Sequence, residues 1–358
     1  MSDTQDEGLA GAMHHQIHLE LDPRHQPEKT YDVALAFDCQ VEDYFSLRVR
    51  ERCVDYGLSF FLVDHIWVDE FLEKLRAGQI AVRFLLDMAS DSTHPDTDAF
   101  YQLAKTVKAR GGHVVDDPDA SLVATSKARF HHDLLENGVG LPFTVMVKRD
   151  QIGLFRLAPE ERPRLATPFV IKPGWDFGHH GVILDATSED DLLRSAAQSA
   201  SDTFLIQELV QPKRLDSHVA WFRVFYVVGE VIPCWWEPPH ATYQLVTPYE
   251  KRAYHLNPLE HMVRKIARLS GMDFFSTEIA LTQDGHFLAI DYLNDQCDMN
   301  TKSYYTSGVP DAVVRRIAWL LMNHAYKLIG KGPFEDEMAE ADREMELERQ
   351  GGHPLAAG

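Results

Sequence analysis

The chain has 358 residues, of which 45% are hydrophobic and 25% are charged, as is usual for a folded globular protein. Its 35 Lys and Arg residues stand against 55 Asp and Glu residues, and the formal net charge of −20 disfavours non-specific binding to nucleic acid or to an anionic membrane. Because this length exceeds one typical core, we expect two or three domains of roughly 100–150 residues.

The cysteine pattern favours a reducing compartment, and the hydropathy pattern predicts no membrane-spanning helix. The four cysteines are scattered and form no Cys-x-x-Cys pair: Cys39, Cys53, Cys234 and Cys297. No signal peptide is recognisable ahead of them, so neither a disulfide framework nor a structural zinc site is expected. No apolar run approaches the roughly 18 residues that a membrane helix needs. We therefore expect a cytoplasmic protein.

Both ends of the chain differ in composition from the rest. Residues 1–29 contain four histidines among polar neighbours and are predicted to form a flexible leader, with a metal-binding tract as the alternative. Residues 331–358 are predicted to form an acidic tail, because residues 335–349 hold eight acidic and only two basic side chains. Such a charge run is typical of a solvated helix or a disordered segment.

Residues 30–118 have the pattern of an α/β domain with a parallel sheet. Three mostly apolar runs have the length of strands buried on both faces of such a sheet: 33–37, 58–63 and 81–86. Apolar residues recur at helical spacing before Gly78 and again before Gly111, where glycine would end each helix. Ligands bind beyond the carboxyl ends of strands in such sheets, so the acidic loop 87–96 is a candidate substrate surface, or else a helix-capping turn.

Residues 119–330 mix helices with antiparallel strands, which predicts an α+β arrangement. Helices are predicted at 126–137, 188–200, 258–269 and 311–328. Strands are predicted at 145–147, 168–172, 182–184, 204–207, 221–228, 231–235, 275–281 and 286–291. The pairs Gly229-Glu230 and Asp284-Gly285 would close two antiparallel hairpins.

One lysine is placed by a buried-strand pattern directly before a glycine-rich loop. Residues 168–182 read Pro-Phe-Val-Ile-Lys-Pro-Gly-Trp-Asp-Phe-Gly-His-His-Gly-Val, so Lys172 is followed by Gly174, Gly178 and Gly181. Glycines let backbone N–H groups approach an anion closely, and lysine adds a charge that phosphate oxygens can share. The spacing matches neither the P-loop nor the dinucleotide fingerprint. The segment is therefore either a phosphate-binding loop or a glycine hairpin with a solvated lysine.

The last predicted hairpin brings acidic residues side by side. Glu278 lies near the start of one strand and Asp291 near the end of its partner, with Asn294 three residues further on. Two carboxylates and an amide are hard oxygen ligands of the kind that suits Mg²⁺, which also keeps substrate phosphates as ligands. A surface hairpin with acids placed by chance is the alternative. The apolar residues 287–290 argue against it, because a buried carboxylate needs a partner or a metal.

These motifs follow one another in a definite order. A helix lysine, Lys127, precedes the turn Gly-Val-Gly-Leu-Pro-Phe-Thr at 138–144. The lysine and glycine loop comes next, then a strand ending in Gln-Glu-Leu-Val, an arginine-bearing strand ending in Val-Val-Gly, and the acidic hairpin. Over residues 80–325 this order resembles the ATP-grasp superfamily, in the branch of the D-alanine:D-alanine ligases, glutathione synthetases and ribosomal-protein glutamate ligases.

The resemblance implies a fold and a set of ATP contacts. It implies a pre-ATP-grasp α/β domain at 30–118 and two α+β lobes, at 119–210 and 211–330, that clamp ATP between them. Lys127 and Lys172 would contact the α- and β-phosphates, and the lid over the phosphates would consist of Gly178, His179, His180 and Gly181. Adenine would be read by the Gln207 side chain, the Glu208 carbonyl and the Val210 N–H, and the ribose by Asp216.

The resemblance also implies the catalytic and metal-binding residues. Arg223 would face the transferred γ-phosphate and act with Lys172 in catalysis, while Glu278, Asp291 and Asn294 would bind Mg²⁺ or Mn²⁺. An exposed strand arginine is the alternative for Arg223.

Three departures from the family pattern concern the metal site and the second substrate. The usual Glu-x-Asn is replaced by Asp-Tyr-Leu-Asn at 291–294, and the usual Ser-Pro-Gly by Asp-Gln-Cys-Asp-Met-Asn at 295–300. The acid that commonly stands two residues before the phosphate arginine is Trp221. Either Asn294 or Asp295 is left to complete the metal site.

The function implied by the resemblance is an ATP-dependent carboxylate–amine ligase that works through an acyl-phosphate. Its partners would be small, amino-acid-like carboxylate and amine substrates, and a homodimer is expected at the level of the family. Asp295 and Asp298 are hypothesised to bind the ammonium group of the amine. The alternatives are a small-molecule kinase of the same fold, similar to the inositol phosphate kinases, and a nucleotide-binding regulatory module without turnover. The identities of the carboxylate, the amine and the product stay open.

Overall fold

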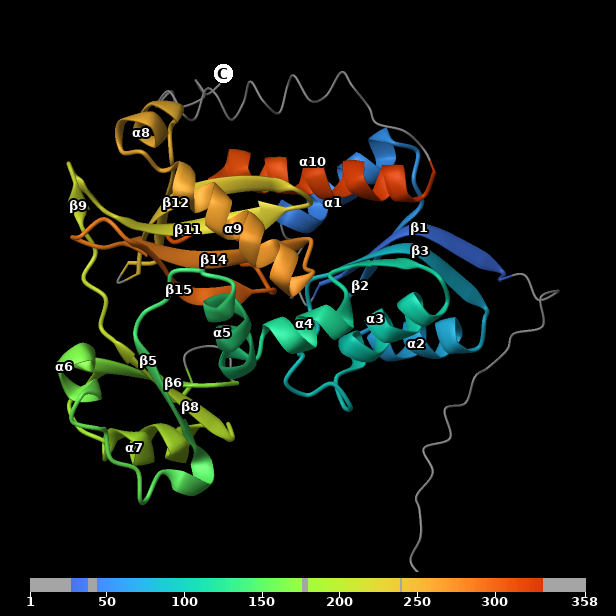
Figure 1. Cartoon of the computed structure of the whole chain (residues 1–358). Coiled ribbons are helices and arrows are strands. Elements are labelled where there is room, and N and C mark those ends of the chain that lie inside the picture. The colour runs from blue at the N-terminus through green and yellow to red at the C-terminus, as the bar shows by residue number, and fades with distance from the viewer. Residues whose placement is uncertain (1–26, 38–43, 176–179, 239, 331–358) are drawn as a thin grey trace, which may run out of the picture.

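The computed structural model of the chain describes residues 27–37, 44–175, 180–238 and 240–330. These residues form three main sheets with helices packed against them, as Figure 1 shows. Apart from residues 27–29, the predicted leader at 1–29 and the predicted acidic tail at 331–358 lie outside the described residues. No helix in the described part of the chain is both long and apolar enough to span a membrane.

The first sheet has four parallel strands in the order β2-β1-β3-β4, which confirms the predicted parallel α/β unit. The strands are β1 (Lys29–Ala36), β2 (Phe60–Val63), β3 (Ile80–Asp87) and β4 (His113–Val115). Helices α2 (Val68–Arg76) and α3 (Ala99–Ala109) pack on one face, and α1 (Tyr44–Asp55) packs on the other together with the last helix of the chain. Burial on both faces explains why these strands are almost continuously apolar.

The largest sheet has five antiparallel strands in the order β13-β12-β11-β14-β15. The strands are β11 (Trp221–Val227), β12 (Glu230–Glu237), β13 (Thr242–Leu245), β14 (Phe274–Leu281) and β15 (Phe287–Asn294). Gly229 and Gly285, with φ angles of 102° and 89°, close the two predicted hairpins in a conformation that favours glycine. Helix α9 (Asn257–Ser270) packs on one face, and α10 (Asp311–Leu328) packs on the other. Because α10 also contacts the first sheet, the two sheets share one hydrophobic core.

The third sheet has four antiparallel strands in the order β5-β8-β6-β7. The strands are β5 (Thr144–Lys148), β6 (Phe169–Pro173), β7 (Ile183–Ala186) and β8 (Thr203–Glu208), and the neighbouring helices are α5 (Lys127–Glu136), α6 (Glu161–Leu165) and α7 (Asp191–Gln198). The chain entering β5 lies directly against β15, because a Cβ on Gly140 would be 2.2 Å from the Phe287 carbonyl oxygen. The Ala289 N–H donates to the Gly140 carbonyl at 2.8 Å. This close contact positions the third sheet beside the acidic hairpin.

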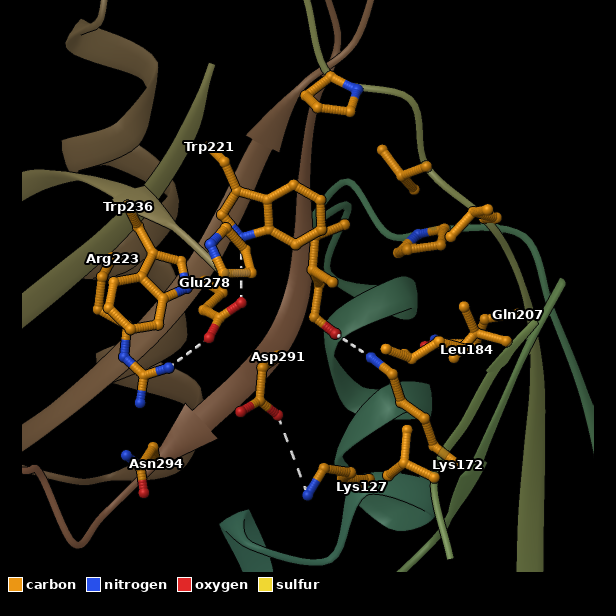
Figure 2. A pocket seen from close by; sticks show the side chains of 18 of the residues that line it. Lys127, Lys172, Leu184, Gln207, Trp221, Arg223, Trp236, Glu278, Asp291 and Asn294 are labelled. Carbon is orange, nitrogen blue, oxygen red and sulfur yellow. Dashed lines mark hydrogen bonds and ion pairs between the residues drawn. The ribbon is translucent and has the colours of Figure 1, made fainter. Parts of the chain in front are cut away.

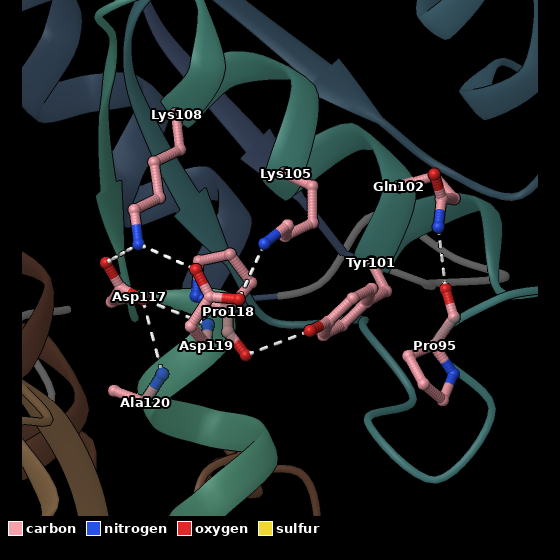
Figure 3. Close-up of polar contacts among 9 residues, drawn as sticks. All are labelled: Pro95, Tyr101, Gln102, Lys105, Lys108, Asp117, Pro118, Asp119 and Ala120. Atoms are coloured by element: carbon pink, nitrogen blue, oxygen red, sulfur yellow. Dashed lines mark hydrogen bonds and ion pairs between the residues drawn. The ribbon is translucent and has the colours of Figure 1, made fainter. Parts of the chain in front are cut away.

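Helix α4 (Pro118–Ala124), which the sequence pattern did not predict, connects the first sheet to α5. The Asp117 side chain caps its first turn, and a proline occupies the first helical position. Figure 3 shows Lys105 and Lys108 of α3 reaching Asp117 and Asp119 at the start of α4. Each pair is partly exposed and contributes little alone, and together the three pairs connect α3 to the start of α4.

The remaining elements are short: η1 (Arg149–Gln151), β9 (Arg214–Leu215), β10 (His218–Val219) and α8 (Pro248–Ala253). The sequence pattern predicted neither β13 nor α8. The strands of each main sheet fall within one of the ranges 30–118, 119–210 and 211–330, apart from Lys29. We therefore keep this division of the chain as a proposal.

Candidate active site

A cavity of about 750 Å³ lies between the third sheet and the five-stranded sheet. Its walls come from α5, β6, β7 and β8 on one side and from β11, β12, β14 and β15 on the other. Most residues that the sequence assigned to one site line this cavity: Lys127, Lys172, His180, Gln207, Glu208, Val210, Arg223, Glu278, Asp291 and Asn294. Side chains as far apart in the sequence as Lys127 and Asn294 therefore line the same cavity.

Of the other four predicted residues, two lie outside the described residues and two are described but do not line the cavity. Gly178 and His179 lie outside the described residues. Gly181 lies behind the wall, where Ser195 donates to its carbonyl oxygen at 2.6 Å. Asp216 lies in the turn between β9 and β10 with a φ of 51° and accepts a hydrogen bond from the Tyr254 hydroxyl. The structure thus does not bring Asp216 together with the other candidates, and sequence order alone gave no sign of this turn.

Two lysines approach the acidic hairpin from the third sheet and α5, as Figure 2 shows. Lys172, near the end of β6, donates from Nζ to the Ile290 carbonyl oxygen at 2.8 Å. Lys127, the first residue of α5, places Nζ 3.9 Å from Asp291 Oδ1. Burial lowers the pKa of Lys172, and the neighbouring Asp291 carboxylate acts against that shift. The cations therefore face the carboxylates across one cavity, as the phosphate-site interpretation requires.

Arg223 and Glu278 form an ion pair that follows from the strand register. The two residues are direct partners across β11 and β14, so their side chains share one face of the sheet. Arg223 donates from Nη1 to Glu278 Oε1 and from Nε to Ser276 Oγ, the latter at 3.1 Å. Burial acts to lower the pKa of Arg223, but the Glu278 carboxylate acts in the opposite direction and the net shift is upward. The guanidinium is thus a permanent cation in the cavity wall.

Two tryptophans that the site assignment did not include flank this ion pair (Figure 2). Trp221 stands two residues before Arg223 on the same face of β11, and its Nε1 donates to Glu278 Oε2 at 3.0 Å. The centroid of the Trp236 ring, on β12, lies 5.7 Å from the Arg223 guanidinium carbon. The two-residue alternation of Trp221 and Arg223 was visible in the sequence, whereas the contact with Trp236 depends on strand pairing.

A bulge in β15 explains how Asp291 and Asn294 reach the same cavity. Residues three apart on a regular strand point to opposite faces. Here Glu278 pairs with Asp291 while Ser276 pairs with Asn294, so β15 carries one extra residue against β14. Both side chains therefore line the cavity. The Asp-x-x-Asn spacing is one residue longer than Glu-x-Asn, and the bulge accommodates this extra residue, so that both side chains face the cavity.

The donor set at this edge fits a hard divalent cation. Glu278, Asp291 and Asn294 offer two carboxylates and an amide oxygen from neighbouring strands, which suits Mg²⁺ when phosphates and water supply the remaining ligands. Within the described residues, no group of three or more His, Cys, Asp or Glu side chains is placed to hold a metal. A metal here would therefore depend on the amide and on the nucleotide.

Asp295 does not share the main cavity. It is 3% exposed, accepts a hydrogen bond from Ser121 and lines a small separate pocket with Asp87 and Asp116. Burial raises the pKa of all three carboxyl groups, that of Asp87 to about 6. Of the two candidates for completing the metal site, Asn294 lies at the cavity and Asp295 does not.

The buried Asp87 carboxyl predicts a pH-dependent stability. Its folded pKa of about 6 exceeds the ordinary value of 3.8. The contribution of this carboxyl group to the free energy of unfolding is therefore present below pH 4 and is lost as pH rises through 6. Asp87→Asn lacks this loss and should be more stable than the wild type at pH 8 by roughly 1–3 kcal/mol, but not at pH 4. Urea unfolding at both pH values measures this difference, and an equal difference at the two values contradicts the assignment.

The backbone conformation and the close packing at Gly181 both favour glycine. Its φ is 69°, and a Cβ there would lie 3.0 Å from Pro173 Cγ and from Ser199 Cβ. Gly181→Ala should therefore lower the free energy of unfolding by roughly 1–2 kcal/mol. Gly153→Ala is the matched control, because a Cβ at Gly153 meets nothing within 4 Å. Thermal unfolding of both variants checks the prediction, which fails if the two lose the same stability.

Comparison with known proteins supports the architecture. No protein-family model and no curated protein matches the sequence. Among solved structures, the ATP-grasp ligase PsnB in complex with precursor peptide PsnA2 and AMPPNP matches with a TM-score of 0.55 at 13% identity, over 83% of this chain and 99% of that chain. The RimK domain protein ATP-grasp from Sphaerobacter thermophilus DSM 20745 matches with a TM-score of 0.54 at 17% identity, over 80% and 97%.

A third match extends over most of the chain. The D-alanine–D-alanine ligase from Bacillus anthracis in complex with ATP has a TM-score of 0.54 at 12% identity, and the match covers 90% of this chain and 99% of that chain. At these identities the likeness concerns the fold. This likeness agrees with the parallel first sheet and with the two antiparallel sheets around one cavity. The chain has the ATP-grasp fold.

Proposed function

We propose that the protein is an ATP-dependent carboxylate–amine ligase. The observation that carries the proposal is the single cavity in which Lys127 and Lys172 face the carboxylates of Glu278 and Asp291, with Arg223 beside them. Fixed cations opposite a set of oxygen ligands for a metal are what a bound triphosphate requires. The solved structures with this fold include ligases described with ATP, AMPPNP, or Mg and ADP.

The chain's own side chains would bind and orient the triphosphate. Lys127 and Lys172, which line the cavity, would contact its α- and β-phosphates, and a pair of unit charges at 4 Å is worth about 4 kcal/mol at an effective dielectric of 20. Arg223, held in place by Ser276 and Glu278, would face the γ-phosphate as its charge redistributes. Mg²⁺ bound by Glu278, Asp291 and Asn294 would add charge neutralisation on the phosphate oxygens.

The proposed reaction needs no protein nucleophile. A carboxylate oxygen of the substrate attacks the γ-phosphorus and releases ADP, which leaves an acyl-phosphate. The amine nitrogen then attacks the acyl carbon, phosphate departs, and the nitrogen loses a proton to give the amide. Positioning and fixed charge carry most of the catalysis in such a sequence. The carboxylate would belong to an amino-acid-like small molecule or to a peptide, since similar structures contain precursor peptides.

A small-molecule kinase is the second candidate. Asp291 in the metal set favours it, because the kinases of this fold use aspartate there. A polyanionic acceptor would need a basic pocket, however, and the small pocket next to the hairpin is lined by Asp87, Asp116 and Asp295. Incubation with ATP, Mg²⁺ and a panel of amino acids, followed by mass spectrometry, distinguishes the ligase from the kinase and from a non-catalytic binding module. An amide with free phosphate supports the ligase, a phosphorylated acceptor supports the kinase, and neither product supports a non-catalytic binding module.

Trp221 is expected to influence the metal through Glu278. Trp221→Phe keeps an aromatic wall but removes the N–H that holds Glu278 Oε2. Loss of such a supporting hydrogen bond should raise the Mg²⁺ concentration for half-maximal turnover by about 10-fold. Magnesium titration at saturating ATP measures this change. Trp319→Phe is the control, because the Trp319 indole on α10 lies away from the cavity, and an equal response in both variants contradicts the role of Trp221.

A further inference from the structure

Arg223 and Trp236 are neighbours on one face of the five-stranded sheet. Arg223 pairs with Cys234 across β11 and β12, and Trp236 lies two residues beyond Cys234, so the side chains of Arg223 and Trp236 point to the same face. The guanidinium carbon lies 5.7 Å from the centroid of the Trp236 ring, within the range of a cation–π contact. Both residues line the cavity, as Figure 2 shows. The strand register thus places an aromatic ring beside the proposed phosphate arginine.

Two hydrogen bonds hold the Arg223 guanidinium and leave one of its nitrogens available. Nε donates to Ser276 Oγ at 3.1 Å, and Nη1 donates to Glu278. Within the described residues Nη2 has no acceptor, so it is available to an oxygen of a bound phosphate. An arginine side chain has many rotamers, and ordering it costs conformational entropy. The contact with the Trp236 ring adds a third restraint on this side chain.

Hydrogen bonding does not explain why an indole occupies position 236. The Trp236 Nε1 atom is buried and, within the described part of the chain, has no hydrogen-bond partner. A buried donor without an acceptor costs free energy, and a phenylalanine or leucine would avoid that cost. The indole does offer a π face, which attracts a guanidinium more strongly than a Phe or Tyr ring does. The contact with Arg223 is therefore the feature that favours tryptophan at this position.

Tyr243 packs against the Trp236 ring. The two residues are direct partners across β12 and β13, and their ring centroids lie 4.4 Å apart. Tyr243 is 5% exposed, and burial raises the pKa of its hydroxyl, so the side chain is neutral and adds no charge beside Arg223. Lys302 Nζ donates to the Tyr243 carbonyl oxygen at 2.8 Å, which anchors the short edge strand β13. Trp236 is thus packed against a residue that is itself held in place.

We infer that the Trp236 ring, supported by Tyr243, holds Arg223 in the orientation in which it faces the transferred phosphate, and that both aromatic residues are positioning residues for phosphoryl transfer. The inference rests on the proposed function, because it takes Arg223 to act on the γ-phosphate. A cation stabilises developing charge best when it is held in place before the reaction begins. Loss of the ring should therefore lower kcat more than it weakens nucleotide binding.

The aromatic contact is tested first, by nuclear magnetic resonance without any substrate. In the full chain with isotope-labelled arginine, the Nε–Hε resonance of Arg223 is identified by its loss in Arg223→Lys. Trp236→Leu should move this resonance, because an aromatic ring shifts nearby proton signals. Trp235→Phe is the matched control, because Trp235 lies on the opposite face of β12 and its Nε1 is also buried without a partner among the described residues. A resonance that stays in place in Trp236→Leu, or that moves equally in Trp235→Phe, overturns the inference.

Steady-state kinetics of ADP release test the effect on catalysis. Trp236→Leu should lower kcat by roughly 3- to 30-fold, as expected for the loss of one cation–π contact, with KM for ATP within about two-fold of the wild type. Trp236→Phe should fall between the wild type and Trp236→Leu, because its ring keeps a weaker π face. Tyr243→Phe should retain more activity than Tyr243→Leu, because the ring and not the hydroxyl supports Trp236. Trp235→Phe should leave kcat unchanged.

The outcomes separate this inference from the proposed function. No ADP release by the wild type overturns the proposed function, whereas the Arg223 resonance still tests the aromatic contact by itself. With an active wild type, an unchanged kcat in Trp236→Leu overturns the inference, as does a KM that rises as much as kcat falls. In an Arg223→Ala background Trp236→Leu should cause no further loss, and a full additional loss contradicts a role through Arg223. If Trp236→Leu does not fold, Trp236→Phe and Tyr243→Leu provide the same comparison.

Discussion

Asp291→Asn should lower the turnover of the proposed ligase by roughly 10²-fold or more while the fold stays intact. Asp291 lines the cavity from the bulged end of β15, and Lys127 approaches its carboxylate to 3.9 Å. The substitution keeps the shape of the side chain but removes the negative charge that a metal and both lysines would share. Steady-state turnover with ATP measures the loss of activity, and a thermal unfolding curve shows whether the fold is intact.

A matched control exists within the same hairpin. Asp284 lies in the turn between β14 and β15, and its side chain is 72% exposed. Asp284→Asn removes an equal charge from the same element without touching the cavity, so its turnover should stay within about two-fold of the wild type. Near-normal activity of Asp291→Asn, or an equal loss in Asp284→Asn, would contradict the role of Asp291 in the site.

Lys172→Ala should cause a loss of similar size, roughly 10² or more in turnover, because it removes a cation that lines the cavity beside the acidic hairpin. Lys172 lies at the ligand-facing end of β6 rather than within a core, so the fold should survive. Lys172→Met separates charge from packing, since it keeps most of the aliphatic stem. Both variants should lose activity, and ATP binding measured directly should weaken in both.

Lys265 provides the comparison for Lys172. Its Nζ also donates to a backbone carbonyl, that of Asn137 at 2.7 Å, but it lies on α9 away from the cavity. Lys265→Ala should leave turnover unchanged. Wild-type turnover in Lys172→Ala or in Lys172→Met would contradict a role for the Lys172 charge in the reaction.

Much of the fold was predictable because strong local patterns coincide with tertiary packing. The apolar runs of β1, β2 and β3 are buried on both faces, and each predicted hairpin turns at a glycine with positive φ. Helix α8 was missed although its signal was present: Thr247 and Glu250 form a capping box, with a proline at the first turn. Its length of six residues gave no periodicity to support a helix.

The site was predictable in its charges and less so in its supporting contacts. Lys172 and Asp291 were placed by the order of motifs, and both line the cavity. The hydrogen bonds of Gln207 to Thr144 and Tyr292 join residues 63 and 85 positions away, so no local pattern could reveal them. Asp216 failed to join the others because motif order locates a segment but not the direction of a side chain within a turn.

The bond from Lys172 to the Ile290 carbonyl links the third sheet to the five-stranded sheet without any ligand. If a phosphate in the proposed ligase drew this ammonium away from Ile290, that link would weaken, and nucleotide binding would be thermodynamically coupled to relative motion of the two sheets. In the proposed ligase this lysine would be shared between the Ile290 carbonyl and the nucleotide, and the strength of its bond to Ile290 would affect how readily the two sheets separate.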